Sequence, residues 1–320
     1  MKTNGKNKYL AFTGGVGGAK LCVGLSKILN AYEIAFVVNT GDDFIHLDFP
    51  ICPDLDSLMY ALSAENNEEL GWGRKGETWN FLRSFAELGG ENWFQLGDRD
   101  LAIHVMRKQL LREGLTLSEV TSELYQRFGI SHAVIPMTNE QVATKIQSQG
   151  ELKSFQKYFV REKCEPKIEK IVYHGSEHSK PAPAVLEKLK DPNLSGVIIC
   201  PSNPFLSIDP ILSLETIKSA LLGLDVPVIA VSPIIHGSAV KGPTDKIMAE
   251  LGFNQSALGV AEHYDNLITH FVLDNADVNL RSEIEKLGLS VLVCNTLMKT
   301  LDDKTELAEN VIKFIKNSSI

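Results

Sequence analysis

Short apolar runs separated by helix-length segments are the feature that most constrains the fold of this chain. Six such runs lie at residues 9–12, 33–38, 196–200, 227–232, 269–273 and 290–294, and all but the first contain β-branched residues. Continuous apolar runs of this length are typical of strands that are buried on both faces of a parallel sheet. Apolar residues at helical spacing lie between or after the runs. The sequence therefore predicts an α/β fold with a Rossmann-like, doubly wound and mainly parallel sheet.

The stretch between residues 54 and 129 differs from the rest because its pattern is mostly helical. Thr116 and Glu119 form a capping box that opens one of the predicted helices. Residues 151–172 alternate in a way that indicates a small antiparallel pair of strands. We expect a single domain over residues 1–320, with core segments at about 9–53 and 130–320 and a helical insertion at about 54–129.

A glycine-rich turn follows the first predicted strand and leads into the first predicted helix. It contains Gly14, Gly15, Gly17 and Gly18, with Lys20 just after them. Glycines at such a turn let backbone N–H groups approach a phosphate, and the N-terminus of the helix adds a positive potential. The spacing fits neither a dinucleotide fingerprint nor a Walker loop. Because one glycine suffices for a tight turn, the presence of four favours phosphate binding.

Acidic residues gather where the second strand is predicted to end and where the next helix begins. Asp42 and Asp43 follow the strand, and Asp54 and Asp56 open the helix. Since ligands bind outside the carboxyl ends of the strands in such sheets, these acids can face the same crevice as the glycine turn. Two carboxylates within about 4 Å repel by roughly 4 kcal/mol at an effective dielectric constant near 20. Mg²⁺ would reverse that repulsion, whereas Asp54 by itself is expected to be the N-cap of the helix.

Further polar residues follow predicted strands and extend this crevice. Asn39 ends the second strand, and Ser202, Asn203 and Pro204 follow the strand that ends at residue 200. We predict that they contact phosphate or nucleotide, although such residues also suit plain turns.

The predicted insertion contains all three tryptophans of the chain, Trp72, Trp79 and Trp93. They suit either a stacking surface for a flat heterocycle or a small core of the insertion itself. Arg99 suits either a clamp for a carboxylate or phosphate or a salt bridge within the chain.

Charge and composition exclude several classes of protein. The 32 Lys and Arg residues against 40 Asp and Glu residues give a formal net charge of −8, which disfavours binding to nucleic acid or to an anionic membrane. The longest uncharged stretch, residues 192–208, is interrupted by Pro201 and Pro204 and is too short to span a bilayer. The N-terminal residues lack a signal-peptide pattern, so we expect a cytoplasmic protein. The five cysteines, without a C-x-x-C pair, are expected to be reduced packing residues.

Short motifs rich in glycine, aspartate and tryptophan extend over nearly the whole chain. In order they are Gly14-Gly-Val-Gly-Gly-Ala-Lys20, Asn39-Thr-Gly-Asp-Asp43, Ile51-Cys-Pro-Asp-Leu-Asp56, Gly71-Trp-Gly73, Glu77-Thr-Trp79, Leu96-Gly-Asp-Arg-Asp100, Pro201-Ser-Asn-Pro204 and Ser232-Pro-Ile-Ile235. Together they closely resemble the 2-phospho-L-lactate transferase family of coenzyme F(420) biosynthesis, and its bacterial branch in particular.

The resemblance implies an activity, a cofactor and partners. Such enzymes transfer a phospho-C3-acid group from its guanosine diphosphate-activated form to the 5′-hydroxyl of the deazaflavin Fo, and GMP is released. The acid is 2-phospho-L-lactate, phosphoenolpyruvate or 3-phosphoglycerate. The family depends on Mg²⁺ and is commonly homodimeric, so the resemblance implies small-molecule substrates, Mg²⁺ and a homodimer.

The resemblance also implies roles for three residues. Asp43 and Asp56 would be catalytic and would hold the metal ion at the phosphates. Because both are placed at the crevice, we also expect one of them to accept the hydroxyl proton. Asp56 and Gln95 would contact the deazaflavin. Gln95 is uncharged where some members of the family carry a basic residue.

Two other functions compete with this one. A non-enzymatic nucleotide- or nucleotide-sugar-binding regulator of the same superfamily would share the fold and the glycine turn, but would have no use for the tryptophan-rich insertion. A dinucleotide dehydrogenase is disfavoured because Lys20 replaces the last fingerprint glycine and Asn39 stands where an acidic ribose ligand is expected.

Overall fold

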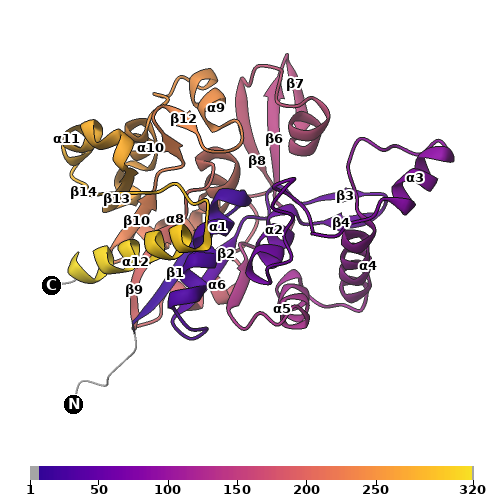
Figure 1. Ribbon diagram of the computed structural model, residues 1–320, viewed down its shortest axis with the longest axis horizontal. Coiled ribbons are helices and arrows are strands. Elements are labelled where there is room, and N and C mark those ends of the chain that lie inside the picture. Colours follow the sequence, from indigo (N-terminus) through magenta and orange to yellow (C-terminus); the bar gives the residue numbers. More distant parts are fainter. Residues whose placement is uncertain (1–6, 319–320) are drawn as a thin grey trace.

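A parallel sheet forms the centre of the molecule (Figure 1). The computed structural model describes residues 7–318, so the N-terminal residues 1–6, where we find no signal-peptide pattern, lie outside this range. The strands of the central sheet are β1 (Lys8–Thr13), β2 (Ile34–Val38), β5 (Ala133–Pro136), β9 (Leu194–Ile199), β10 (Val228–Val231), β13 (His270–Asp274) and β14 (Ser290–Cys294). Within the described range these seven strands have the order β14-β13-β10-β9-β1-β2-β5, and all neighbours pair in parallel. The predicted doubly wound α/β fold is confirmed.

Helices and short strands surround this sheet. The helices are α1 (Gly15–Ile28), α2 (Pro53–Leu62), α3 (Asn80–Glu87), α4 (Asp98–Arg112), α5 (Leu117–Arg127), α6 (Pro183–Leu189), α7 (Asp209–Leu212), α8 (Glu215–Leu222), α9 (Thr244–Glu250), α10 (Ala257–Tyr264), α11 (Arg281–Glu285) and α12 (Leu301–Ser318). Shorter helical turns are η1 (Lys157–Arg161), η2 (Pro204–Ile208), η3 (Asp265–Leu267) and η4 (Asn275–Leu280). The smaller strands are β3 (Phe44–His46), β4 (Phe49–Ile51), β6 (Ala143–Ser148), β7 (Glu151–Ser154), β8 (Lys170–His174), β11 (Ile234–Ile235) and β12 (Ser238–Ala239).

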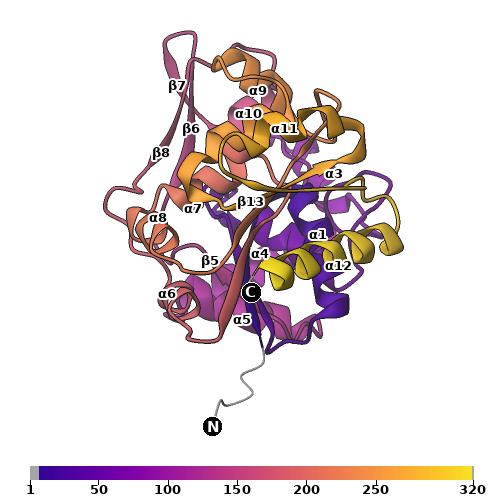
Figure 2. The same ribbon diagram turned by 90° about the vertical axis from the view of Figure 1, so that its left-hand side faces the viewer.

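Alternate residues of the central strands enter two separate cores, because both faces of the sheet are covered. Leu10 and Phe12 of β1 point into one core, and Tyr9 and Ala11 point into the other. Helices α1, α2 and α12 pack on the Tyr9 side, where α12 lies beside α1 (Figure 2). Complete burial of a side chain such as Phe12 contributes roughly 1.5–3 kcal/mol to stability.

The direction of the chain through the sheet reverses beside β1. From β1 the chain proceeds through β2 to β5, whereas β9, β10, β13 and β14 follow one another on the other side. The switch point therefore lies between β1 and β9. In an open α/β sheet the ligand crevice forms outside the carboxyl ends of the strands at this point, which here are the segments after Thr13 and Ile199.

The region between β4 and β5 contains helices α2 to α5 and no strand of the central sheet. Helix α3 lies far out from the sheet, with α4 nearer to it (Figure 1). The predicted capping box is present, since Thr116 accepts from the Glu119 N–H and the Glu119 side chain accepts from the Thr116 N–H.

A three-stranded antiparallel sheet replaces the predicted pair of strands at residues 151–172. Its order is β7-β6-β8, and β6 begins at residue 143, outside the predicted range. Sequence pattern missed β6 because Ile146 is its one large apolar residue and the rest of the strand is small or polar. Among the residues that the structure describes, no helix has the length and apolarity needed to cross a bilayer.

Candidate functional site

The glycine-rich turn packs tightly against the loop that follows β9. Ser202 Oγ accepts from the Gly14 N–H at 3.2 Å and donates to the Gly14 carbonyl at 2.7 Å. A Cβ atom at Gly18 would lie 2.3 Å from Ser202 Oγ, and one at Gly17 would lie 2.5 Å from the carbonyl oxygen of Pro201. Close packing therefore explains Gly17 and Gly18, whereas Gly15 is required by its φ of +63°, so the number of glycines alone no longer favours phosphate binding. The predicted binding residues at the ends of β1 and β9 are nonetheless brought together.

The N-terminus of α1 is in contact with a carboxylate of the chain itself. Gly15, which has a φ of +63°, donates its N–H to Asp54 Oδ1 at 2.8 Å. Asn39 Nδ2 donates to Asp54 Oδ2 at 2.9 Å. The prediction that Asp54 is the N-cap of α2 is wrong, because Cys52 is the N-cap and Asp54 lies inside the first turn. Its carboxylate crosses to α1, where the helix dipole favours a negative charge.

The side chains of other residues that we predict to contact nucleotide are hydrogen-bonded within the chain itself. Lys20 Nζ donates to the Met298 carbonyl at 2.9 Å. The Asn203 side chain accepts from the N–H groups of Phe205 and Leu206, each at 3.0 Å, and so caps η2, which Pro204 begins. The roles of these residues in nucleotide binding stay predictions.

Carboxyl groups at the end of β2 and in the first turn of α2 form a largely buried acidic cluster of Asp42, Asp43, Asp54 and Asp56. Within residues 7–318, Asp42 Oδ1, Asp43 Oδ1 and Asp56 Oδ2 are buried oxygens without a hydrogen-bond partner. Burial raises the pKa of Asp42 and of Asp43 well above the usual range, and the neighbouring carboxylates add to the shift. Burial also raises the pKa of Asp54 to about 6. Buried acceptors of this kind require a donor group or a cation to offset their desolvation.

One carboxylate oxygen of Asp56 accepts a hydrogen bond from the insertion, and the other has no hydrogen-bond partner among the described residues. Asp56 Oδ1 accepts from Arg107 Nη2, and the Arg107 side chain is almost fully buried. Arg107 Nη1 also donates to the Pro50 carbonyl at 3.1 Å and contacts His104 Nδ1 at 3.0 Å. Burial by itself would lower the pKa of Arg107, but the Asp56 carboxylate outweighs it, so the pKa lies above the ordinary value.

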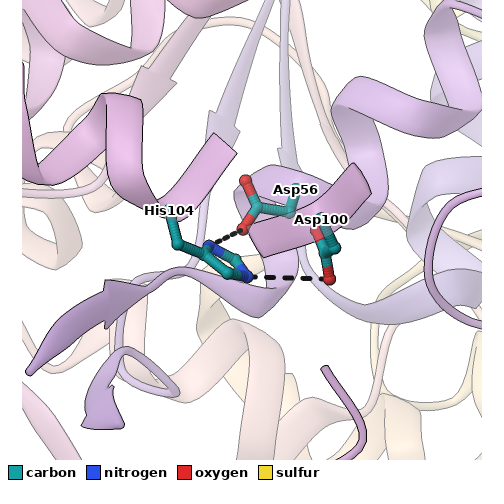
Figure 3. A group of neighbouring side chains, drawn as sticks. All are labelled: Asp56, Asp100 and His104. Carbon is teal, nitrogen blue, oxygen red and sulfur yellow. Dashed lines mark ion pairs between the residues drawn. The ribbon is translucent and has the colours of Figure 1, made fainter. Parts of the chain in front are cut away.

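Figure 3 shows His104 between the carboxylates of Asp56 and Asp100. His104 Nδ1 lies 3.8 Å from Asp56 Oδ2, and His104 Nε2 lies 3.6 Å from Asp100 Oδ2. By distance alone the three side chains could hold a metal ion. However, a guanidinium can only donate, so the contact with Arg107 engages the lone pair of Nδ1. The two carboxylates also lie at opposite ring nitrogens, so this trio as it stands does not fit one ion.

The sequence motifs include Asp100 but neither His104 nor Arg107. Asp100, His104 and Arg107 are spaced i, i+4 and i+7 on α4, which places them on one face of that helix. Three polar residues at this spacing are a signal for a polar helix face. The sequence does not show which partner that face meets.

A hollow of about 500 Å³ lies against α3 and includes Gln95. Its lining residues are Trp79, Leu82, Arg83, Ala86, Glu87, Asn92 and Gln95. The Trp72 and Trp79 rings meet edge to face with centroids 6.3 Å apart, whereas Trp93 packs on His46 at 5.4 Å. The tryptophans therefore divide between two aromatic groups, and only Trp79 lines the hollow. The contact of Gln95 with a deazaflavin stays a prediction.

Arg99 is held within the insertion. Its guanidinium donates to the Lys75 carbonyl at 2.6 Å and to Glu65 Oε2 at 3.2 Å. Of the two interpretations offered by the sequence, the structure favours the salt bridge. All five cysteines are free thiols, and three of them are buried, as expected of packing residues.

Comparisons with known proteins cover nearly the whole chain. A family model described as 2-phospho-L-lactate transferase CofD matches residues 10–314. A phosphoenolpyruvate transferase of Streptomyces coelicolor is 36% identical over 311 residues, which are 95% of this chain and 97% of that protein. A 2-phospho-L-lactate transferase of Methanocaldococcus jannaschii is 39% identical over 306 residues, which are 94% of this chain and 96% of that protein.

The fold also matches solved structures. A crystal structure of a UPF0052-family protein from Bacillus halodurans superposes with a TM-score of 0.65 and covers 96% of this chain and 99% of its own, at 16% identity. This likeness supports the fold alone. The family match and the two relatives identify the chain more closely. The chain belongs to the 2-phospho-L-lactate transferase CofD family.

Proposed function

We propose that the protein transfers a phospho-C3-acid group from its guanosine diphosphate-activated form to the 5′-hydroxyl of Fo, in coenzyme F(420) biosynthesis. The observation that carries the proposal is the family match over residues 10–314, with relatives at 36% and 39% identity that are named as transferases. A non-enzymatic regulator is not favoured by these matches. The donor acid is left open, since relatives named for phosphoenolpyruvate and for 2-phospho-L-lactate are about equally similar.

We further propose that the acidic cluster holds Mg²⁺ through Asp43 and Asp56. The orphaned Asp43 Oδ1 and Asp56 Oδ2 support this assignment, because anionic oxygen ligands are the ones that Mg²⁺ prefers. In addition to burial, neighbouring carboxylates raise the pKa of Asp42 and of Asp43, and a cation would relieve this repulsion. When bound, the metal ion would neutralise charge on the diphosphate oxygens.

The chain's own residues then have two tasks in the transfer. The 5′-oxygen of Fo attacks the β-phosphorus, the bond from that phosphorus to the GMP oxygen breaks, and GMP leaves with the electron pair. Asp43 or Asp56 accepts the proton of the attacking hydroxyl. Asp56 also has to keep its free oxygen oriented toward that hydroxyl. The hollow containing Trp79 and Gln95 offers an aromatic face for the deazaflavin ring.

The decisive assay incubates the protein with Fo, Mg²⁺ and each of the three activated donors. Release of GMP and formation of the Fo phosphodiester, both followed by chromatography and mass spectrometry, are the expected results. Asp43→Asn is the matched control, because it removes one charge with little change of shape, and we expect it to abolish turnover. Binding of donor without GMP release from any of the three would favour the regulator instead.

Side-by-side competition among the three donors would identify the acid. One or two pocket residues can discriminate such small groups by about 10–200-fold. We also propose, from the resemblance to the family, that the protein is a cytoplasmic homodimer, which light scattering on the purified protein and fractionation of cells would test.

A further inference from the structure

We propose that Arg107, with His104 beside it, is a positioning residue for Asp56. It engages Asp56 Oδ1 and thereby leaves Oδ2 as the single oxygen that faces substrate or cation. The inference rests on the proposed function, because it assigns Asp56 a role in the transfer. Neither residue belongs to the motifs that carry the family resemblance.

The guanidinium of Arg107 is fixed from several directions. It donates to Asp56 Oδ1 through Nη2, and through Nη1 to the Pro50 carbonyl at 3.1 Å. The side chain is 2% exposed, so water does not compete for these bonds. A planar guanidinium that donates to several acceptors at once is held in one orientation. It therefore also fixes the orientation of the carboxylate to which it donates.

His104 lies next to both Arg107 and Asp56 and supports Arg107 through its ring nitrogen. Its Nδ1 accepts from Arg107 Nη1 at 3.0 Å, so in the neutral ring the proton lies on Nε2, which faces Asp100 Oδ2 at 3.6 Å. Asp100 in turn accepts from the hydroxyl of Tyr60. A polar chain of Tyr60, Asp100, His104 and Arg107 therefore leads to Asp56.

The two ends of this chain are on the same helix. Tyr60 and Asp56 are four residues apart on α2, whereas the three residues between them in the chain are on α4. The network thus clamps one face of α2 against one face of α4. Because Asp56 Oδ1 and the His104 lone pair are both engaged, Asp56 Oδ2 is the buried oxygen of this carboxylate that has no hydrogen-bond partner among the described residues, although it lies 3.8 Å from His104 Nδ1.

The first test is Arg107→Lys, which keeps the positive charge but removes the planar guanidinium with its several N–H donors. A misplacement of a reacting group by 1 Å can cost about 10²-fold in rate. We expect kcat for GMP release to fall about 10²-fold, with the KM for Fo unchanged within about threefold. Arg127→Lys is the matched control, because Arg127 makes an exposed ion pair with Glu123 at 2.9 Å on α5, and its kcat should stay at the wild-type value.

A double-mutant cycle separates positioning from general damage. If Arg107 acts through Asp56, Arg107→Lys should cost almost nothing more in the Asp56→Asn background. Equal losses of kcat in the wild-type and Asp56→Asn backgrounds would overturn the proposal, as would wild-type kcat in Arg107→Lys.

A second pair of variants covers the case in which Arg107→Lys does not fold. His104→Asn keeps an acceptor near the position of Nδ1, whereas His104→Leu removes it. We expect His104→Asn to retain most of kcat and His104→Leu to lose about 10–100-fold, which is the range found when a residue that orients a ligand is replaced. Equal kcat in the two variants would contradict the role of the lone pair.

Binding of Mn²⁺, followed by electron paramagnetic resonance, tests the inference without turnover. Arg107→Lys should weaken Mn²⁺ binding about tenfold in the wild-type background and not at all beside Asp56→Asn. If the wild-type protein releases no GMP from any donor, the proposed function fails and the Mn²⁺ titration still decides whether Arg107 orients Asp56. Unchanged Mn²⁺ affinity in Arg107→Lys would contradict the inference in that case.

Discussion

The Asp54 carboxylate accepts the backbone N–H of Gly15 at 2.8 Å, so the first turn of α2 is tied to the first turn of α1. The second oxygen of the same carboxylate accepts from Asn39 at 2.9 Å. The buried Asp54 thus joins the glycine turn to the acidic cluster. A phosphate that used the Gly15 N–H would have to replace this carboxylate.

Replacement of Asp54 should change how stability depends on pH. Its pKa is raised from 3.8 to about 6, so the unfolded chain loses the proton at lower pH than the native protein does. The native protein therefore loses stability as the pH rises from about 4 to about 6, by about 3 kcal/mol for a shift of about two pKa units. Asp54→Asn should remove that loss. Urea unfolding of both proteins at pH 4.5 and 7.5, with EDTA present, measures it, and identical pH dependence would contradict the assignment.

Substitution of Gly18 should destabilise the protein because there is no room for a Cβ atom. The new atom would lie 2.3 Å from both Ser202 Oγ and Thr13 Oγ1. We expect Gly18→Ala to lower the free energy of unfolding by about 1–3 kcal/mol, the usual cost of overpacking. Gly223→Ala is the control, because its nearest atoms are 3.6 and 3.7 Å away and its φ is negative. Chemical denaturation should separate the two variants clearly.

Gln95 should affect affinity for the deazaflavin and not affinity for the donor. Gln95→Ala removes one polar contact worth about 0.5–1.5 kcal/mol, so the KM for Fo should rise about two- to tenfold. The KM for the activated donor should stay constant. Gln109→Ala is the matched control, since that amide donates to Glu113 on the exposed side of α4. Steady-state kinetics with each substrate varied in turn would show a change in donor KM if the prediction is wrong.

Removal of divalent cations should abolish donor binding. The chain is acidic overall, with a net charge of −8, and the donor is itself a polyanion. With Asp43 and Asp56 unneutralised, repulsion should dominate, so calorimetry should detect no donor binding in EDTA and should detect it again after Mg²⁺ is added. A purely basic pocket would bind the donor equally well in both conditions.

Much of the fold was predictable because the relevant signals are local. The apolar runs that form β1, β2, β9, β10, β13 and β14 can each be recognised from a few residues. A strand that is buried on both faces requires apolar side chains on both faces. The short motifs were sufficient to predict the family. They also led to Asp43 and Asp56, whose roles stay predictions.

The contacts that those residues make could not be predicted, because the contacting residues are distant in the sequence. Ser202 is 188 residues from Gly14, and Arg107 is 51 residues from Asp56. A local pattern suggests that α4 has a polar face, but it does not show that Asp56 meets that face. In the same way, the sequence predicted that Asp54 is an N-cap, whereas tertiary packing directs its carboxylate to α1.

The sequence by itself determined the α/β class, the parallel sheet and the membership of the family, because these depend on side-chain periodicity and on the order of short motifs. Only the tertiary structure decided why the glycines are required, which oxygen of Asp56 is free and which side chains hold it. Those properties depend on distances between segments that are far apart in the chain. Such distances are set by the close packing of the folded protein.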